Sequence, residues 1–174
     1  MKHPIVVVGL LMLGCVSCDQ VTKQAAVRWL AGEPTATYLG DTFRLTFMEN
    51  HGAFLGMGTS WPPLARWLAF TLLSGLMVGA ALWFVLRHLP ERRMSPTIWG
   101  GLLLAAGGIG NLIDRIWNNG AVTDFVMFGL GPLHTGILNV ADIAVTFGAL
   151  AFAWLGFRQE SSSEWSDPIE PSES

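Results

Sequence analysis

Asp124 and Asp142 are the residues of this sequence that could most directly perform chemistry, because neither has a base adjacent to it in the chain. Two carboxylates that converge on one water molecule can hydrolyse an amide, with one ionised as the base and the other protonated as the acid. At about 4 Å and an effective dielectric constant near 20, their repulsion is on the order of 4 kcal/mol, or about three pKa units, so the pair would share one proton near neutral pH. Simpler interpretations stay open at this point: Asp142 as a helix cap and Asp124 as a turn residue in a loop.

The composition indicates which elements must position these aspartates. Of 174 residues, 51% are hydrophobic and only 13% are charged, whereas charged residues make up about 25% of a soluble domain. Four apolar stretches contain no Asp, Glu, Lys or Arg, and a spanning helix needs about 20 such residues. Allowing two of the helices one carboxylate near an end, we predict an all-α integral membrane protein with four transmembrane helices, at about 5–27, 65–86, 97–117 and 137–157.

Outside the spans, the chain is predicted to form a small sheet and a tail. Alternating polar and apolar residues over 42–47 predict a strand, and hence a small sheet against the membrane. The connection 87–96 has three Arg and 118–136 has none, which places both termini in the cytoplasm and the sheet on the other side. We expect a single membrane-embedded domain over 1–158 and a disordered acidic tail over 159–174, which has too few apolar residues to pack.

If the four helices cross the membrane in this way, the polar residues gather at one membrane face. Ionisable groups inside spans are costly, so they mark either function or helix packing. Three sets have helical i+3 or i+4 spacing and so share a helix face: Asp19 with Lys23, Asn111 with Asp114 and Arg115, and Asn139 with Asp142. Asn50 and Asp124 join the cluster from the outer connections. For the charged pairs, the simpler interpretation is that they fix helix packing.

Other reaction types and other classes of protein are less well supported by the sequence. The chain has no clustered basic residues for nucleic acid, its four His have no paired zinc-ligand spacing, and no G-x-S-x-G surrounds a serine. Leu13-Gly14-Cys15 loosely resembles a lipoprotein processing site, which would make the first 20 residues a cleaved signal peptide. A small transporter is a second alternative, although it predicts polar residues through the inner half of the bundle. A non-catalytic assembly factor is a third, and would tolerate loss of both aspartates.

Five motifs in order resemble the lipoprotein signal peptidase family, also called signal peptidase II. They are Asp19-Gln20-Val21-Thr22-Lys23, Asn50-His51-Gly52-Ala53-Phe54, Gly107 to Arg115 (GGIGNLIDR), Val122-Thr123-Asp124-Phe125 and Asn139-Val140-Ala141-Asp142. Two departures from the usual pattern are Leu138, where many members have Phe, and a single Ala after Gly52, where many have two. Neither removes a catalytic group.

The resemblance implies a membrane aspartyl endopeptidase whose peptidase domain is the 1–158 segment. It would act at the periplasmic face of the bacterial inner membrane, cutting diacylglyceryl-modified prolipoproteins before the lipidated Cys. Asp124 and Asp142 would be catalytic, and Asp19, Lys23 and Asp114 would be structural polar pairs. Site support or substrate binding would come from Asn50, Gly52, Asn111, Arg115, Asn139 and Ala141. No metal or other cofactor is implied; the partners would be the prolipoprotein and membrane lipid, not nucleic acid, and we expect a monomer.

Overall fold

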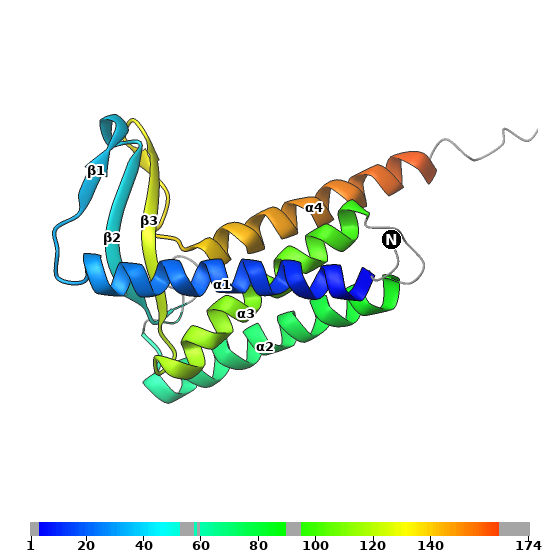
Figure 1. Cartoon of the computed structure of the whole chain (residues 1–174), viewed down its shortest axis with the longest axis horizontal. Coiled ribbons are helices and arrows are strands. Elements are labelled where there is room, and N and C mark those ends of the chain that lie inside the picture. Colours follow the sequence, from blue (N-terminus) through cyan, green and yellow to red (C-terminus); the bar gives the residue numbers. More distant parts are fainter. Residues whose placement is uncertain (1–3, 53–57, 59, 90–94, 164–174) are drawn as a thin grey trace, which may run out of the picture.

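Four helices form the body of the protein. The computed structural model describes residues 4–52, 58, 60–89 and 95–163. Its helices are α1 (Pro4–Leu30), α2 (Pro63–His88), α3 (Pro96–Trp117) and α4 (Val140–Ser163) (Figure 1). Three of them, α1, α2 and α3, are long and apolar enough to cross a membrane, and the described apolar part of α4, Val140–Trp154, is shorter. Each predicted span coincides with one helix.

The fourth helix differs most from its prediction. It was predicted over 137–157, but it begins at Val140, because Asn139 caps its first turn and the preceding residues pair with the sheet: the backbone of Leu138 bonds with Val126. At its other end the helix continues to Ser163, so residues 159–163 are helical and do not belong to a disordered tail. Arg158, Gln159 and Glu160 are all good helix formers, which explains the extension. The rest of the predicted tail, 164–174, lies outside the described residues.

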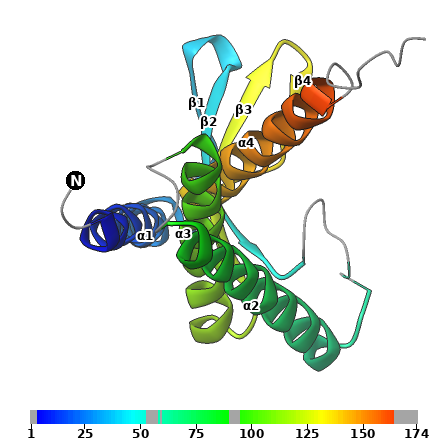
Figure 2. The ribbon, with the colours of Figure 1, turned by 90° about the vertical axis from the view of Figure 1, so that its right-hand side faces the viewer.

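Helix α3 is the centre of the bundle. It packs against α1, α2 and α4, and Figure 2 shows the other three helices spread around it. Small residues allow this close packing. A Cβ added at Gly107 would lie 2.4 Å from the carbonyl oxygen of Ala141, and one added at Gly148 would lie 2.8 Å from that of Gly100, so α3 and α4 touch through their backbones.

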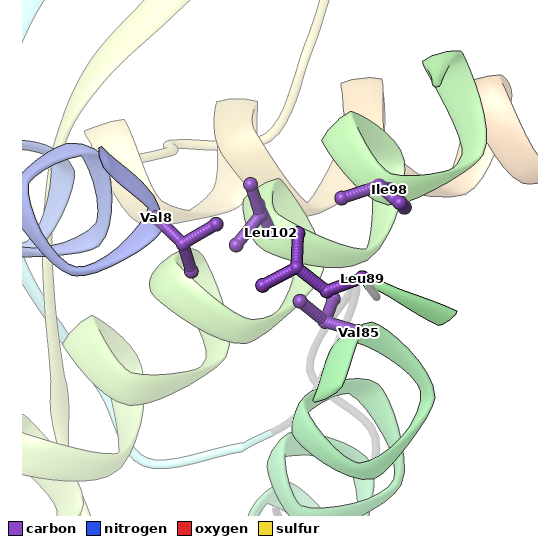
Figure 3. Packing of buried hydrophobic residues seen from close by; sticks show 5 residues of the cluster. All are labelled: Val8, Val85, Leu89, Ile98 and Leu102. Atoms are coloured by element: carbon purple, nitrogen blue, oxygen red, sulfur yellow. The ribbon is translucent and has the colours of Figure 1, made fainter. Parts of the chain in front are cut away.

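A small apolar core closes the end of the bundle far from the sheet. Val8 of α1 meets Val85 and Leu89, at the end of α2, and Ile98 and Leu102 of α3, all of them buried (Figure 3). Most other large apolar side chains on α1 and α2 are exposed, as expected for helices that face lipid. The bundle is therefore held by α3 and by polar contacts at its other end.

A four-stranded antiparallel sheet, in the order β1-β2-β3-β4, lies at the other end. Its strands are β1 (Ala36–Tyr38), β2 (Phe43–Asn50), β3 (Val122–Leu130) and β4 (Leu133–His134). Strand β2 confirms the strand predicted over 42–47. The mainly helical body with a small sheet is as predicted, but the sequence pattern located only one of these four strands. Helices α1 and α3 run towards the sheet, α2 and α4 run away from it, and the sheet projects sideways past the bundle (Figure 1).

Candidate active site

Asp124 lies in β3, near the point where the sheet meets the helix ends. It is the third residue of the strand and is opposite Met48 of β2, so it is not the turn residue of the simpler interpretation. Its side chain is only 1% exposed. Oδ1 accepts a hydrogen bond from Asn139 Nδ2 at 2.6 Å, and Oδ2 accepts one from Asn50 Nδ2 at 2.9 Å. The strand therefore fixes this carboxylate between two amides.

The surroundings of Asp124 favour its protonated form. Burial and, to a smaller extent, the neighbouring charge of Asp142 together raise the pKa of this carboxyl from 3.8 to about 6, although the hydrogen bonds from Asn50 and Asn139 oppose the rise. The effect of burial on the pKa is larger than that of the two hydrogen bonds from the asparagine amides. Asp124 is therefore able to hold or release a proton close to neutral pH.

Asp142 lies in the first turn of α4 and has two roles. Its backbone N–H donates to Asn139 Oδ1 at 2.8 Å, and its Oδ2 accepts from the backbone N–H of Asn139 at 3.3 Å, which is a reciprocal cap of the helix. The cap predicted as the simpler interpretation is therefore present. Its other oxygen, Oδ1, accepts from Asn111 Nδ2 at 2.8 Å and points into the polar cluster. Capping fixes the rotamer of Asp142 and leaves it half-buried at the site.

Asn139 joins the two aspartates. Its side-chain amide donates to Asp124 and its backbone N–H to Asp142. The same amide also lies 3.2 Å from Asn111 Oδ1 and 3.3 Å from the carbonyl oxygen of Thr123. Asn139 is fully buried. One side chain therefore connects β3, α3 and the start of α4, and sets where the two carboxylates stand relative to each other.

A buried ion cluster lies beneath this site. Lys23 of α1, 2% exposed, has its Nζ 2.8 Å from Asp19 Oδ2 and 3.1 Å from Asp114 Oδ2 of α3. Asp19 Oδ1 accepts from the backbone N–H of Ala141 at 2.8 Å, and Asp114 Oδ2 accepts from that of Thr123 at 2.9 Å. The cluster thus ties α1 and α3 to the segments that carry Asp142 and Asp124.

Lys23 also sets the orientation of Asn111. Its ammonium, which can only donate, lies 2.9 Å from Asn111 Oδ1. The amide nitrogen of Asn111 is therefore on the other side, where it donates to Asp142. Lys23 therefore acts on Asp142 indirectly, by fixing the orientation of the Asn111 amide.

The other predicted residues lie around the same cluster. Gly52 donates its N–H to Asn50 Oδ1 at 3.0 Å, which holds the Asn50 amide towards Asp124. Arg115 is half-buried; its Nη1 lies 3.4 Å from the carbonyl oxygen of Asn111, and its Nε is buried without a hydrogen-bond partner among the described residues. Ala141 is buried and contributes its backbone N–H. Two residues of the second motif, Ala53 and Phe54, lie outside the described residues.

Sequence reasoning did not single out Gln20. Its Nε2 donates to Asp114 Oδ1 at 3.1 Å and to the carbonyl oxygen of Gly110 at 3.2 Å, and lies 3.2 Å from Asp19 Oδ2. A neutral amide inside an apolar helix, next to an aspartate, was the signal that could have found it. Thr123 was missed as well, because it contributes only its backbone groups, which a sequence pattern does not show.

The fold and the site define a helical membrane protein with a buried cluster of carboxylates at one end of its bundle. The family model described as signal peptidase (SPase) II matches residues 11–158. The lipoprotein signal peptidase of Chlorobium luteolum is 39% identical over 151 residues, covering 81% of this chain and 85% of its own length. That of Hydrogenovibrio crunogenus is 40% identical over 153 residues, with 83% and 84% covered. The chain belongs to the signal peptidase II family, and is therefore a peptidase.

A solved structure shows the same fold. A bacterial membrane enzyme determined by the in meso method at 2.3 Å resolution superposes with a TM-score of 0.74 at 20% sequence identity, covering 95% of this chain and 96% of that one. At this level of identity the agreement supports the arrangement of helices and sheet. It confirms the membrane fold with its small antiparallel sheet.

Proposed function

We propose that this protein is an aspartyl endopeptidase that removes signal peptides from diacylglyceryl-modified prolipoproteins, cutting before the lipidated Cys. The observation that carries the proposal is the joint contact of Asn139 with Asp124 and Asp142. Family membership supports the substrate class, since relatives covering most of the chain are lipoprotein signal peptidases.

The placement in the membrane is part of the proposal. All four helices cross the bacterial inner membrane, with both termini in the cytoplasm and the sheet at the periplasmic face. This is supported by the alternating directions of the helices and by the position of the sheet at one end of the bundle (Figure 1). A lipidated substrate is already held in the bilayer, so a site at this level receives it in a restricted orientation. We expect the chain to act as a monomer without a metal or other cofactor.

In the proposed reaction, the two aspartates share one proton and activate one water. The ionised carboxylate removes a proton from the water as its oxygen attacks the scissile carbonyl carbon. The protonated carboxyl then gives its proton to the leaving nitrogen of the lipidated Cys as the C–N bond breaks. Two products result, a signal peptide with a new carboxylate and a lipoprotein with a free amine. The high pKa of Asp124 supports its role as the proton donor.

Arg115 and Asn50 are placed to assist this reaction. The buried Nε of Arg115 has no hydrogen-bond partner in the described part of the chain, so it has unused donor capacity beside the cluster, which suits the carbonyl oxygen of a bound peptide. Asn50 holds Asp124 in place through a bond that Gly52 supports from behind. We assign substrate positioning to Arg115 and support of the acid to Asn50.

The test is to change Asp124→Asn and Asp142→Asn separately in the full chain, reconstituted in lipid. A diacylglyceryl prolipoprotein and the same prolipoprotein without lipid are offered to each variant, and the new N-terminus is read by mass spectrometry. We expect both variants to lose at least about 10³-fold in kcat, since a catalytic acid or base contributes about 10²–10⁴-fold. Asp41→Asn, an exposed acid of the sheet, is the matched control and keeps its activity. Wild-type rates in either site variant would refute the aspartyl mechanism, whereas equal cleavage of the unlipidated substrate would refute only the specificity.

A further inference from the structure

The free end of the sheet carries a row of aromatic rings across three strands. Tyr38, Phe43 and Phe128 are direct neighbours in the strand register. The ring centroids of Tyr38 and Phe43 are 6.1 Å apart, and those of Phe43 and Phe128 are 5.8 Å apart. Tyr38 and Phe128 are exposed despite these ring contacts. The row is therefore an exposed aromatic surface, which a sheet facing water on both sides would not need.

Exposed leucines continue this surface at the two connections of the free end. Leu39, in the short 3-10 turn between β1 and β2, is 81% exposed. Leu130 and Leu133, which pair across the turn between β3 and β4, are 79% and 75% exposed. Together with the aromatic row they form what we call the apolar tip, consisting of Tyr38, Leu39, Phe43, Phe128, Leu130 and Leu133.

The opposite face of the same end is polar. Side chains alternate between the two faces of a strand, so Arg44 and Thr37 point away from the aromatic row. Arg44 is paired with Asp41, whose Oδ2 lies 3.5 Å from Nε2 of His134. Asp41 and Arg44 are partly exposed, and Thr37 is exposed. The sheet end therefore has one aromatic face and one charged face.

The aromatic face is the one turned towards the helices. Asp124, Val126 and Phe128 alternate along β3 and so share a face of the sheet. Asp124 reaches Asn139 at the start of α4, which places this face on the side of the bundle. The sheet projects sideways beyond the helices, with both connections at its far end (Figure 1). The apolar tip therefore overhangs the space beside the bundle, where lipid surrounds the exposed apolar side chains of the helices.

We infer that the apolar tip is inserted into the bilayer interface and that the lipid bilayer itself is its partner. Aromatic rings with adjacent leucines suit the boundary between headgroups and acyl chains, while Arg44 and His134 remain on the water side. The surface is continuous with the lipid-facing bundle. Because Asp124 and the aromatic row lie on the same face of one strand, the inserted tip also fixes the depth of the catalytic residue in the membrane.

The direct test measures the surroundings of the tip without relying on peptidase activity. The two native cysteines are replaced (Cys15→Ala, Cys18→Ala), and spin labels are attached to single Leu39→Cys or Leu130→Cys variants in nanodiscs that hold one chain each. Thr37→Cys, next to Tyr38 but on the polar face, is the matched control. We expect labels at 39 and 130 to collide several-fold more with oxygen, which concentrates in lipid, than with a water-soluble nickel chelate, and the label at 37 to show the reverse.

Each other outcome overturns the inference. Labels at 39 and 130 that behave like the label at 37 would show that the tip stands in water. Exclusion of the nickel chelate only after prolipoprotein is added would assign the surface to the substrate, and exclusion only in nanodiscs with two chains would assign it to a second copy. These measurements separate this inference from the proposed function, since they are made whether or not Asp124 and Asp142 prove catalytic.

Discussion

The raised pKa of Asp124 predicts that this residue lowers the stability of the folded protein at neutral pH. A carboxyl that is more basic in the folded state binds its proton more tightly there than in the unfolded state. The folded protein is therefore stabilised below the unfolded pKa, and this contribution is lost as pH rises from the unfolded to the folded value. For Asp124 these values are 3.8 and about 6. Asp124→Asn has no such proton to lose.

The size of the effect follows from the difference between the two pKa values. Two pKa units at about 1.4 kcal/mol each correspond to about 3 kcal/mol. Between about pH 4 and about pH 7 we therefore expect the unfolding free energy of the wild type to fall by about 3 kcal/mol relative to that of Asp124→Asn. Asp124→Asn also places an amide opposite the donors of Asn50 and Asn139, which has a cost in stability. That cost is the same at every pH, so it does not affect the change in stability between the two pH values.

Reversible unfolding by SDS in mixed micelles, followed over this pH range, measures the difference. Asp41→Asn is a control without this pH dependence. The hydrogen bond from Arg44 lowers the pKa of Asp41, with a further lowering by the charges of Arg44 and His134. The stability that Asp41 contributes is therefore almost complete above its unfolded pKa of 3.8, and between about pH 4 and about pH 7 the difference between the wild type and Asp41→Asn should change little. A difference between the wild type and Asp124→Asn that stays constant to within about 1 kcal/mol would refute the reasoning from burial.

Substitutions at three further positions probe the packing around the site, and a fourth position, Gly75, serves as a control; all are measured by the same unfolding assay. Lys23→Met leaves two buried carboxylates without their cation, and should cost about 3–5 kcal/mol; a loss below about 1 kcal/mol would show that water reaches the cluster. At Gly110 an added Cβ would lie 2.5 Å from Asp19 Oδ2, so Gly110→Ala should cost about 1–3 kcal/mol. Gly75→Ala, where the Cβ meets nothing within 4 Å, should instead stabilise α2 by up to about 1 kcal/mol, and equal effects at both glycines would contradict the close packing. Asn139→Ala removes the cap of α4 and should cost about 1–2 kcal/mol of stability. Asn139→Ser can still cap the helix, so it should regain that part of the stability without regaining activity. Activity in the Ser variant would show that the amide is not needed at the aspartates.

The helices could be predicted from the sequence because one physical requirement fixes them. A span needs a long apolar stretch, and charged residues such as Arg66 and Arg87 delimit one directly. Strand β3 gave no comparable signal, since Val122–Leu130 has apolar residues on both faces and lacks the regular alternation of polar and apolar residues. Its position depends on pairing with β2, which is distant in the chain.

The residues that gather in the candidate site could be named from the sequence, but their contacts could not. An acid such as Asp142 among apolar residues indicates that a polar partner lies nearby. The spacing of the two residues suggested that Asn139 faces Asp142 across one turn of the same helix. Asn139 in fact lies before the helix and caps it, and the same cap brings its side chain to Asp124. The Asp142 carboxylate both caps α4 and faces Asn111 in the candidate site. A sequence pattern could present its capping role and its proposed catalytic role only as alternatives.

The central position of α3 has a consequence for how the chain is made. Synthesis delivers α1 and α2 to the membrane first, yet beyond the contact at Val8 these two helices share little surface among the described residues. Until α3 is synthesised, Lys23 lacks its second carboxylate, Asp114. We therefore expect the early chain to be a pair of loosely associated helices until α3 supplies both their common packing surface and the second carboxylate.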